Sequence, residues 1–405
     1  MSVQQSAVPV SVASPGDLPT PLRGRIVAGL SGPYRSIPVL IVLGLIWLYF
    51  YSQNSAYLTT TNITNLTLQI VTTAILALGV VFVLLVGEID LSSAMLSGVC
   101  ATVTAQLAIK SDWPLWVAIG GGVVVGLLFV LAEALVIIFG VPSLIVTLGG
   151  MVILQGLLLV VLPPEFAINI GGTDYAKISS TYVPAGWSFA IAGVGWLLFC
   201  VARYRSHRGR DASATSSALL WLGVPAVVSG AAVFGAVAVL SEGRGLPLPV
   251  LILVGMLLIG WYFTSRTRYG THLYAVGGNR EAAQRAGIPV SRMVVYSFLV
   301  LGVCAAVAGI VEASRLLAVS NSSGGGPLML NAIAAAVVGG ASLFGGRGTV
   351  WAALLGALVI GSINNGVQLL GLSTEVQSFA TGGVLILAVA IDVVITRGSL
   401  LPNRR

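Results

Sequence analysis

The chain has 405 residues, of which 57% are hydrophobic and 8% are charged, and its mean hydropathy is +0.99. Soluble domains carry about 25% charged residues, so this composition excludes a water-soluble enzyme, a disordered chain and a disulfide scaffold. The 50 glycines favour a packed membrane bundle, because small residues let transmembrane helices approach closely. The net charge of +7 lies in short loops between apolar runs, which indicates membrane topology rather than nucleic-acid binding.

The first segment, residues 1–35, has no long apolar run, and we interpret it as a flexible cytoplasmic tail rather than a signal peptide. A membrane-spanning helix needs about 20 mostly apolar residues, and the pattern predicts twelve such segments, some of them short. They are 37–51, 66–86, 91–109, 114–139, 143–162, 187–202, 217–240, 247–264, 293–313, 327–344, 348–370 and 376–396. Two of them could be re-entrant or broken, which would leave ten full crossings. The predicted fold is an all-α polytopic membrane bundle over 36–397, followed by a short cytoplasmic tail at 398–405.

The basic residues divide unequally between the two sides of this map. One side receives Arg23, Arg25, Arg35, Arg203, Arg205, Arg208, Arg210, Arg266, Arg268, Arg280, Arg285, Arg292, Arg347, Arg397, Arg404 and Arg405, and the other receives Lys110, Lys177, Arg244 and Arg315. Because cytoplasmic loops carry an excess of Lys and Arg, the split of 16 to 4 places both termini in the cytoplasm.

Two cytoplasmic loops differ in character. Residues 203–216 are rich in Arg, Ser and Ala, and we interpret them as a solvated linker. In the loop 265–292, Asn279 can cap a short helix from Arg280 to Ala286, and Gly287 would end it. Its predicted exposed surface mixes charged and amide side chains with Ala282, Ala283 and Ala286. Such a helix suits docking onto another protein, and the alternative is an ordinary ordered connector.

Signatures of bond chemistry are absent from the sequence. No Gly-rich loop ends in Lys-Ser or Lys-Thr, and no Gly-x-Ser-x-Gly motif occurs. His207 and His272 have no acidic or Cys partner at the spacing of metal ligands, and Cys100, Cys200 and Cys304 stand alone. We therefore expect no metal and no cofactor bound by this chain, and a transport path or a binding surface rather than an enzyme.

Ionisable groups at membrane depth are costly and are functional candidates by default. The sequence Gly-Glu-Ile-Asp-Leu-Ser-Ser at 87–93 interrupts a long apolar stretch and supplies Glu88, Asp90 and Ser92. Asp90 or Ser92 could cap the following helix. The alternative is a broken helix that lines a polar cavity, where irregular backbone is tolerated at depth.

Further polar residues lie inside predicted spans. Glu133 is in the middle of 114–139, where it could bond to a neighbouring helix or line a cavity. Asn364 and Gln368 share a helix face, with Asn365 beside them, and their amides suit either a hydroxyl-rich ligand or interhelical bonding. The weaker candidates are Thr147, Gln155 and Asn331, and Glu312 and Asp392 lie near span ends, where we expect ordinary solvated groups.

Three stretches of the chain resemble the ribose/xylose-type permease subunits of ATP-driven sugar importers, and the xylose-type branch most of all. They are Gly87-Glu88-Ile89-Asp90-Leu91-Ser92, the stretch 141–149 (VPSLIVTLG), and the run from Tyr274-Ala275-Val276-Gly277-Gly278-Asn279 through 338–348 (VGGASLFGGRG) to Asn364-Asn365-Gly366. Together they cover roughly residues 70–396. The linker at 203–216, followed by another span, also resembles that branch.

The resemblance implies a pair of permeases, which would be a homodimer or two near relatives, bound to two cytoplasmic ATPase subunits that use the ATP. It also implies an extracytoplasmic binding protein that delivers a sugar, in the inner membrane of a bacterium. The loop containing Asn279, Arg280, Glu281, Ala282, Ala283, Arg285 and Gly287 resembles the loop by which importer permeases dock on their ATPase. The substrate pathway suggested by polarity comprises Glu88, Asp90, Ser92, Glu133, Thr147, Asn331, Asn364, Asn365 and Gln368.

The chain departs from the family pattern near this pathway. The family usually has acidic residues where Met329 and Asn331 stand, and an Asn is common where Glu133 stands. The transported compound could therefore be xylose, another pentose, a hexose or a polyol. The main alternative function is a secondary transporter in which Glu88, Asp90 or Glu133 carries protons or ions.

Overall fold

A computed structural model describes residues 37–208 and 223–400 of the chain. Its long helices are α2 (Ile37–Gln53), α3 (Thr60–Leu85), α4 (Ser93–Ala105), α5 (Leu115–Ile138), α6 (Ser143–Val161), α8 (Ala185–Arg208), α10 (Val224–Glu242), α11 (Leu248–Arg266), α12 (Arg268–Gly278), α14 (Val290–Leu316), α15 (Leu328–Val338), α16 (Trp351–Leu369) and α17 (Thr374–Leu400). The short elements are η1 (Ser55–Leu58), the π-helical turn η2 (Gln106–Lys110), α7 (Lys177–Ser180) and α13 (Arg280–Arg285), with strands β1 (Ala167–Asn169), β2 (Tyr182–Val183), β3 (Leu246–Pro247) and β4 (Ala318–Ser320).

The predicted all-α membrane bundle is confirmed for the part of the chain that the structure describes. A helix corresponds to each of the twelve predicted spans, and six of them (α3, α5, α6, α11, α14 and α16) are long and apolar enough to cross a membrane. Helix α15 has only eleven residues, about 16 Å at 1.5 Å per residue, which is half the thickness of a hydrocarbon core. The predicted N-terminal tail and most of the predicted linker lie outside the described residues, and α17 extends to Leu400.

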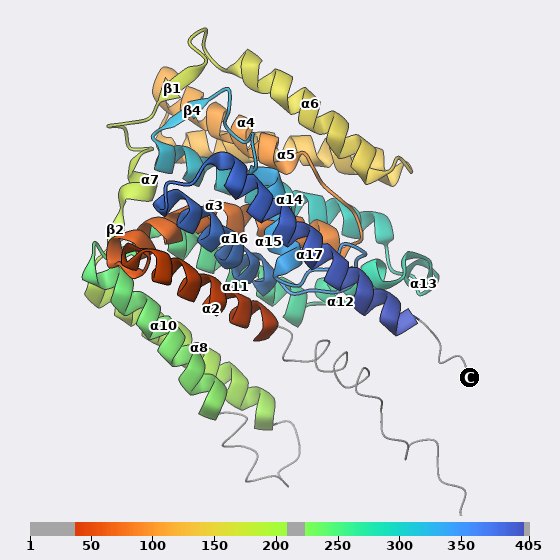
Figure 1. The fold of residues 1–405 in the computed structure, drawn as a ribbon. Coiled ribbons are helices and arrows are strands. Elements are labelled where there is room, and N and C mark those ends of the chain that lie inside the picture. The colour runs from red at the N-terminus through yellow and green to blue at the C-terminus, as the bar shows by residue number, and fades with distance from the viewer. Residues whose placement is uncertain (1–36, 209–222, 401–405) are drawn as a thin grey trace, which may run out of the picture.

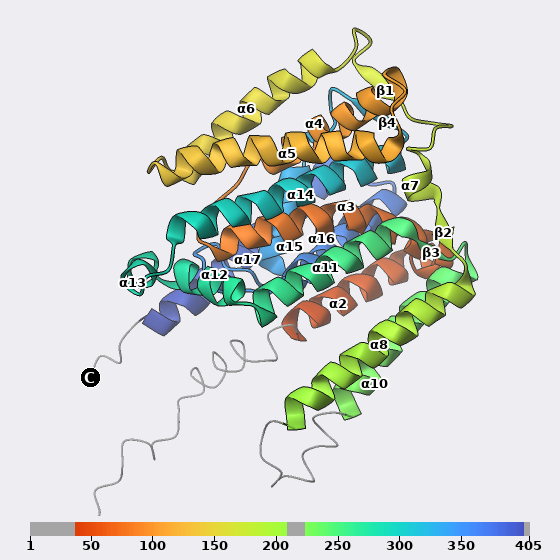
Figure 2. The ribbon, with the colours of Figure 1, turned by 180° about the vertical axis from the view of Figure 1, so that it is seen from behind.

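The bundle has two distinct ends (Figures 1 and 2). At one end, which we call the strand end, β1 pairs antiparallel with β4 and β2 pairs antiparallel with β3. At the other end, the α13 end, α12 leads into the short helix α13. The four residues assigned to the outer side, Lys110, Lys177, Arg244 and Arg315, all lie at or beside elements of the strand end.

Helix α3 is the centre of the bundle. In its most apolar window 83% of the residues are buried, against 22% in α6. It packs against α14, α15 and α16, and α14 in turn packs against α4 and α5. Helix α6 lies at one edge, and the pair of α8 and α10 lies at the opposite edge (Figure 1). The outer helices expose Leu, Val and Phe side chains, as lipid contact requires.

Glycines in the core allow backbone contact between helices. A Cβ on Gly309 of α14 would overlap the backbone of Ser97 on α4, and a Cβ on Gly356 of α16 would overlap the backbone of Ala335 on α15. This close packing explains the glycine content. In lipid no hydrophobic driving force holds helices together, so they associate through van der Waals contact, and small residues let their backbones come close enough for it.

Candidate functional site

A polar cavity of about 520 Å³ lies inside the bundle, nearer the strand end. Its walls come from α3, α4, α14, α15, α16, the first turn of α17 and the connection between β4 and α15. That connection turns inward: Ser323 and Gly324 lie against the backbone of Gly98 and Ala94 on α4. The eleven-residue α15 begins at this depth, so the chain forms a half-helix whose first turn borders the cavity. Irregular backbone at membrane depth is stable because it faces a polar space rather than lipid.

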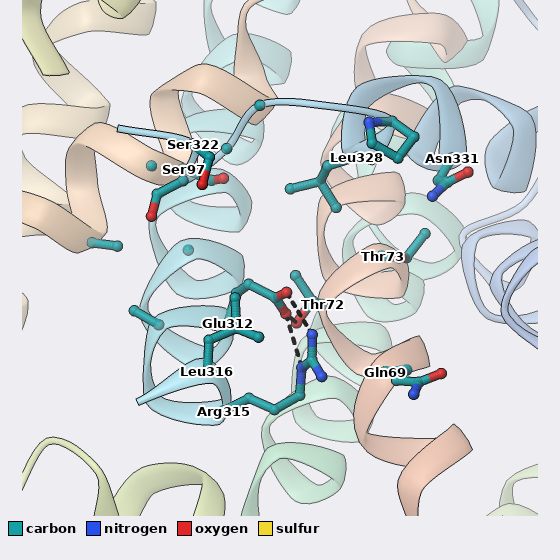
Figure 3. A pocket seen from close by; sticks show the side chains of 18 of the residues that line it. Gln69, Thr72, Thr73, Ser97, Glu312, Arg315, Leu316, Ser322, Leu328 and Asn331 are labelled. Atoms are coloured by element: carbon teal, nitrogen blue, oxygen red, sulfur yellow. Dashed lines mark hydrogen bonds and ion pairs between the residues drawn. The ribbon is translucent and has the colours of Figure 1, made fainter. Parts of the chain in front are cut away.

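An ion pair dominates one wall of the cavity (Figure 3). Arg315 donates from Nη2 to Glu312 Oε1 at 2.7 Å and from Nε to Glu312 Oε2 at 3.2 Å. Thr72 on α3 donates its hydroxyl to Glu312 Oε2 at 2.7 Å. Both charged side chains are about one-quarter exposed. The pair therefore offers hydrogen-bond donors and acceptors to the cavity without a net charge.

Amide side chains line the opposite parts of the cavity. Asn331 on α15 is buried, and its Oδ1 has no hydrogen-bond partner. Asn364 and Gln368 on α16 also line the cavity, and Gln69 on α3 donates to Gln368 at 3.5 Å. This oxygen is closed to solvent, so it does not face the open space of the cavity. The amides of Gln69, Asn364 and Gln368 are therefore the ones suited to bond a hydroxyl-bearing ligand.

Asn365 lies outside this cavity. Its amide exchanges hydrogen bonds with Asn62 on α3, at 2.8 Å and 3.2 Å, and it joins α16 to α3. It borders a second polar depression of about 500 Å³, which shares Gln69, Arg315 and Gln368 with the cavity. The two hollows therefore form one polar region at the strand end.

Glu88, Asp90, Ser92, Glu133 and Thr147 do not line the cavity. Asp90 accepts hydrogen bonds from the backbone N–H groups of Ser92 and Ser93 at 3.2 Å and 3.0 Å, so it caps the start of α4. Of the two alternatives that the sequence left open for Asp90, a helix cap or the lining of a cavity, the structure therefore shows the helix cap. The hydroxyl of Ser143, the first residue of α6, accepts a hydrogen bond from the backbone N–H of Ile89 at 3.2 Å, which fixes the same turn.

Two buried carboxyl groups meet at Ser92. Its Oγ lies 2.7 Å from Asp90 Oδ1 and 3.1 Å from Glu133 Oε2. A hydroxyl has one hydrogen to donate, so it can serve only one of two ionised carboxylates. The geometry is satisfied if Ser92 donates to Asp90 and a protonated Glu133 donates to Ser92. Glu133 then joins α5 to the start of α4 as a neutral donor.

We expect Glu133→Gln to keep uptake within about twofold of wild type, because the amide can donate the same hydrogen bond, and Glu133→Leu to lower uptake about tenfold by leaving polar groups unpaired. Initial rates in membrane vesicles measure both variants at equal amounts of inserted protein. An inactive Gln variant would show that the charge or the proton of Glu133 is itself used in transport.

Glu88 connects the turn between α3 and α4 to the α13 end of the bundle. Its side chain is 9% exposed, and its Oε1 accepts from Nη1 of Arg280 at 2.6 Å. Arg280 is the first residue of α13. The sequence placed these two residues in different sites, a pathway and a docking loop, and the structure joins them.

Backbone contacts reinforce this link. A Cβ on Gly277 would overlap both the carbonyl of Leu85 and the N–H of Gly346, and the N–H of Gly346 itself donates to Leu85 at 3.1 Å. Gly345 and Gly346 have positive φ angles of 85° and 67°. Three chain segments, the end of α3, the end of α12 and the turn before α16, therefore meet without side chains between them. We call this contact the glycine joint.

Helix α13 has the form that the sequence predicts at its N-terminus. The side chain of Asn279 accepts from the backbone of Ala282 at 2.9 Å, and Gly287 follows with φ of 79°. Glu281, Ala282 and Arg285 are exposed. Ala283 was predicted on the exposed surface, and this is wrong: it is 4% exposed, and its carbonyl accepts from Ile288. It anchors α13 to the bundle.

Glu88→Ala and Arg280→Ala should each lower uptake about tenfold, and the double variant should be no worse than the single ones, because contacting residues are coupled by about 0.5–3 kcal/mol. A double-mutant cycle on initial uptake rates measures this coupling. Effects that multiply would mean that the ion pair has no role in transport.

Glu312, Arg315 and Thr72 are not among the site residues that the sequence predicts. Glu312 lies near the end of a predicted span, where a charged group can be solvated, and Arg315 contributes only to the predicted topology. The i, i+3 spacing of Glu312 and Arg315 was a local signal for an ion pair. Nothing local indicated that this helix face borders a cavity.

Apolar helices around a charge-balanced polar cavity, with a capped surface helix joined to the core at one end, define a polytopic membrane transport component. The chain belongs to the family described as "Branched-chain amino acid transport system / permease component", whose model matches residues 62–389. It is a transport subunit rather than an enzyme, and a multi-pass protein of the bacterial inner membrane.

Individual relatives agree with the resemblance found in the sequence. The chain is 35% identical over 362 residues to the xylose transport system permease protein XylH of Escherichia coli K12, which covers 88% of this chain and 91% of that protein. It is 36% identical over 368 residues to XylH of Haemophilus influenzae, a match that covers 87% of this chain and 95% of that protein. It is 32% identical over 358 residues to the D-allose transport system permease protein AlsC of E. coli K12, a match that covers 88% of this chain and 91% of that protein. No solved structure gives a significant match.

Proposed function

We propose that this chain is the membrane-spanning permease of an ATP-driven importer for a monosaccharide. The observation that carries the proposal is the cavity of about 520 Å³, which is lined by the Glu312–Arg315 ion pair and by amide and hydroxyl side chains. The xylose, allose and ribose permeases among its relatives support the same substrate class.

The chemistry of the cavity favours a neutral, hydroxyl-rich substrate. Glu312 and Arg315 neutralise each other, and the remaining polar groups are amides and hydroxyls that both donate and accept. A branched-chain amino acid, which the family description names, would need an apolar pocket for its side chain and separate partners for its two charges. A pentose, hexose or polyol fits this lining better.

The α13 end is the cytoplasmic side in this proposal, as the basic residues predict. Two ATPase subunits dock there on the exposed residues of α13 and its ends, which are Asn279, Arg280, Glu281, Ala282, Arg285 and Gly287, and these subunits hydrolyse the ATP. A second permease copy completes the assembly, and an extracytoplasmic binding protein delivers the sugar to the strand end.

Alternating access follows from the contacts at the α13 end. A displacement of α13 passes through the Arg280–Glu88 ion pair and the glycine joint to the turn that starts α4. Helix α4 continues from that turn to Ser97 and Gly98, which line the cavity. Movement of the ATPases can therefore change the cavity without any bond chemistry in this chain.

Uptake by vesicles that contain this chain, an ATPase and a sugar-binding protein from a xylose-type importer tests the proposal. We expect ATP-dependent accumulation of one compound from a panel of labelled pentoses, hexoses and polyols. Accumulation without ATP that collapses with an uncoupler would indicate a secondary transporter instead.

Replacing the exposed residues of α13, as in Glu281→Arg/Ala282→Trp, should abolish uptake and leave membrane insertion intact, because the docking surface is lost while the buried Ala283 is kept. The control is Glu165→Arg, an exposed carboxylate at the strand end. Co-purification of the ATPase and uptake are measured together. Normal uptake in the double variant would contradict the docking assignment.

A further inference from the structure

A second hollow of the bundle is apolar and lies on its outer surface. It has a volume of about 530 Å³ and runs between α3, α11 and α14. Its floor is formed by Leu78 and Phe82, which are buried, and its rim by Ile259 and Phe263, which are about half exposed. We call it the apolar groove.

Gly260 creates the width of this groove. It lies on α11 opposite α3, and a Cβ at this position would be 3.4 Å from the ring of Phe82. Any larger side chain would extend from there into the groove or against its floor. The groove therefore depends on the absence of a side chain at one residue.

The groove, together with the arginine beyond its end, covers the depth of about one leaflet of a bilayer. On α11 its lining runs along one helix face from Met256 through Ile259 and Gly260 to Phe263, and the same face reaches Arg266. The ten steps from Met256 to Arg266 rise about 15 Å, which is half of a hydrocarbon core of about 30 Å.

The end of the groove toward α13 is aromatic and basic. Tyr269 and Tyr296 line it, with their ring centroids 6.2 Å apart. Arg266 and Arg292 are exposed and continue the groove-lining faces of α11 and α14 by one turn. Arg266 lies over the ring of Trp261, 5.4 Å from its centroid, and neither arginine has an acidic partner among the side chains that the structure describes. Tyr and Arg at the end of an apolar surface mark the depth of lipid headgroups.

We propose that the apolar groove binds one acyl chain of an anionic phospholipid from the leaflet at the α13 end, with its phosphate held by Arg266 and Arg292. The apolar lining accounts for the chain, and the two exposed guanidinium groups, which have no acidic partner, account for the phosphate. A second copy of the permease is a poorer occupant. In a two-fold interface the same surface meets itself, so these arginines would lie at equal depth facing like charges.

Native mass spectrometry of the detergent-purified permease, titrated with phosphatidylglycerol or phosphatidylcholine, tests the site. The wild-type chain should prefer phosphatidylglycerol, and Arg266→Gln/Arg292→Gln should reduce this preference roughly tenfold or more, since each basic residue near the surface contributes about 1 kcal/mol. Gly260→Phe should weaken the binding of both lipids, because the new ring fills the groove.

Two controls keep the result specific. Gly255→Phe places the same side chain on α11 at a residue with open space around it and outside the groove, and Arg285→Gln removes an exposed charge from α13. Both should bind lipid as the wild type does. Equal binding by Gly260→Phe and wild type would overturn the proposal. So would a disulfide between two chains carrying Ile259→Cys in membranes, because it would place a second copy in the groove.

Discussion

Gly277→Ala is expected to lower ATP-driven uptake by about a hundredfold or more, which corresponds to a loss of about 2.7 kcal/mol. A methyl group at this position would overlap the carbonyl of Leu85 and the N–H of Gly346. Both neighbours are backbone atoms, so no side-chain rotation can make room. The glycine joint would open, and motion of α13 would no longer reach the start of α4.

The matched control is Gly278→Ala, one residue further along the chain. A Cβ at Gly278 has no atom within 4 Å, so this variant should transport within about twofold of wild type, as exposed substitutions usually do. Initial uptake rates and the ATPase activity of the assembled complex are measured together. Equal uptake by the two variants would show that the joint does not transmit motion.

Glu312→Gln is expected to lower the kcat/KM of uptake by about 10- to 100-fold, because hydrogen bonds to charged groups contribute about 1.5–3 kcal/mol. The amide keeps the shape of the side chain but leaves Arg315 without a counter-charge in the cavity. The cavity would then carry a net positive charge, and a neutral sugar would have to compete with water for the guanidinium group.

Glu242→Gln provides a close control. Glu242 also lies at the strand end and accepts a hydrogen bond from a threonine of α3, Thr60, but it is exposed and outside the cavity. Uptake by this variant should equal that of the wild type over the whole range of sugar concentration. If both Gln variants lose activity equally, general disturbance of the strand end would explain the effect, and Glu312 would have no special role at the cavity.

The helices could be predicted from the sequence because hydrophobic runs of sufficient length have few alternatives in a membrane. The cap of α13 could be predicted for a similar reason, since Asn279 and its partner Ala282 are three residues apart. Asn364 and Gln368 border the cavity together because one turn of helix separates them. Each of these predictions used only local geometry.

The remaining site residues depend on contacts between distant segments. Glu88 and Arg280 are 192 positions apart in the chain, and no local pattern relates them. Polarity at membrane depth selected Glu88, Asp90 and Glu133 without indicating whether a cavity or another side chain faced them. The position of Glu312 within its own helix indicates only that it lies near the end of a span. The polar space beside it is created by the inward turn before α15, a distant segment of the chain.

The balanced charges of Glu312 and Arg315 bear on the electrical side of transport. Moving one elementary charge across a membrane costs or releases about 2.3 kcal/mol per 100 mV. A sugar carries no charge, and a cavity that holds one carboxylate beside one guanidinium group presents no net charge to the field when it changes its exposure. Import through such a cavity is electroneutral, so its rate should not follow the membrane voltage, and a cell with a collapsed potential could still take up sugar as long as it holds ATP.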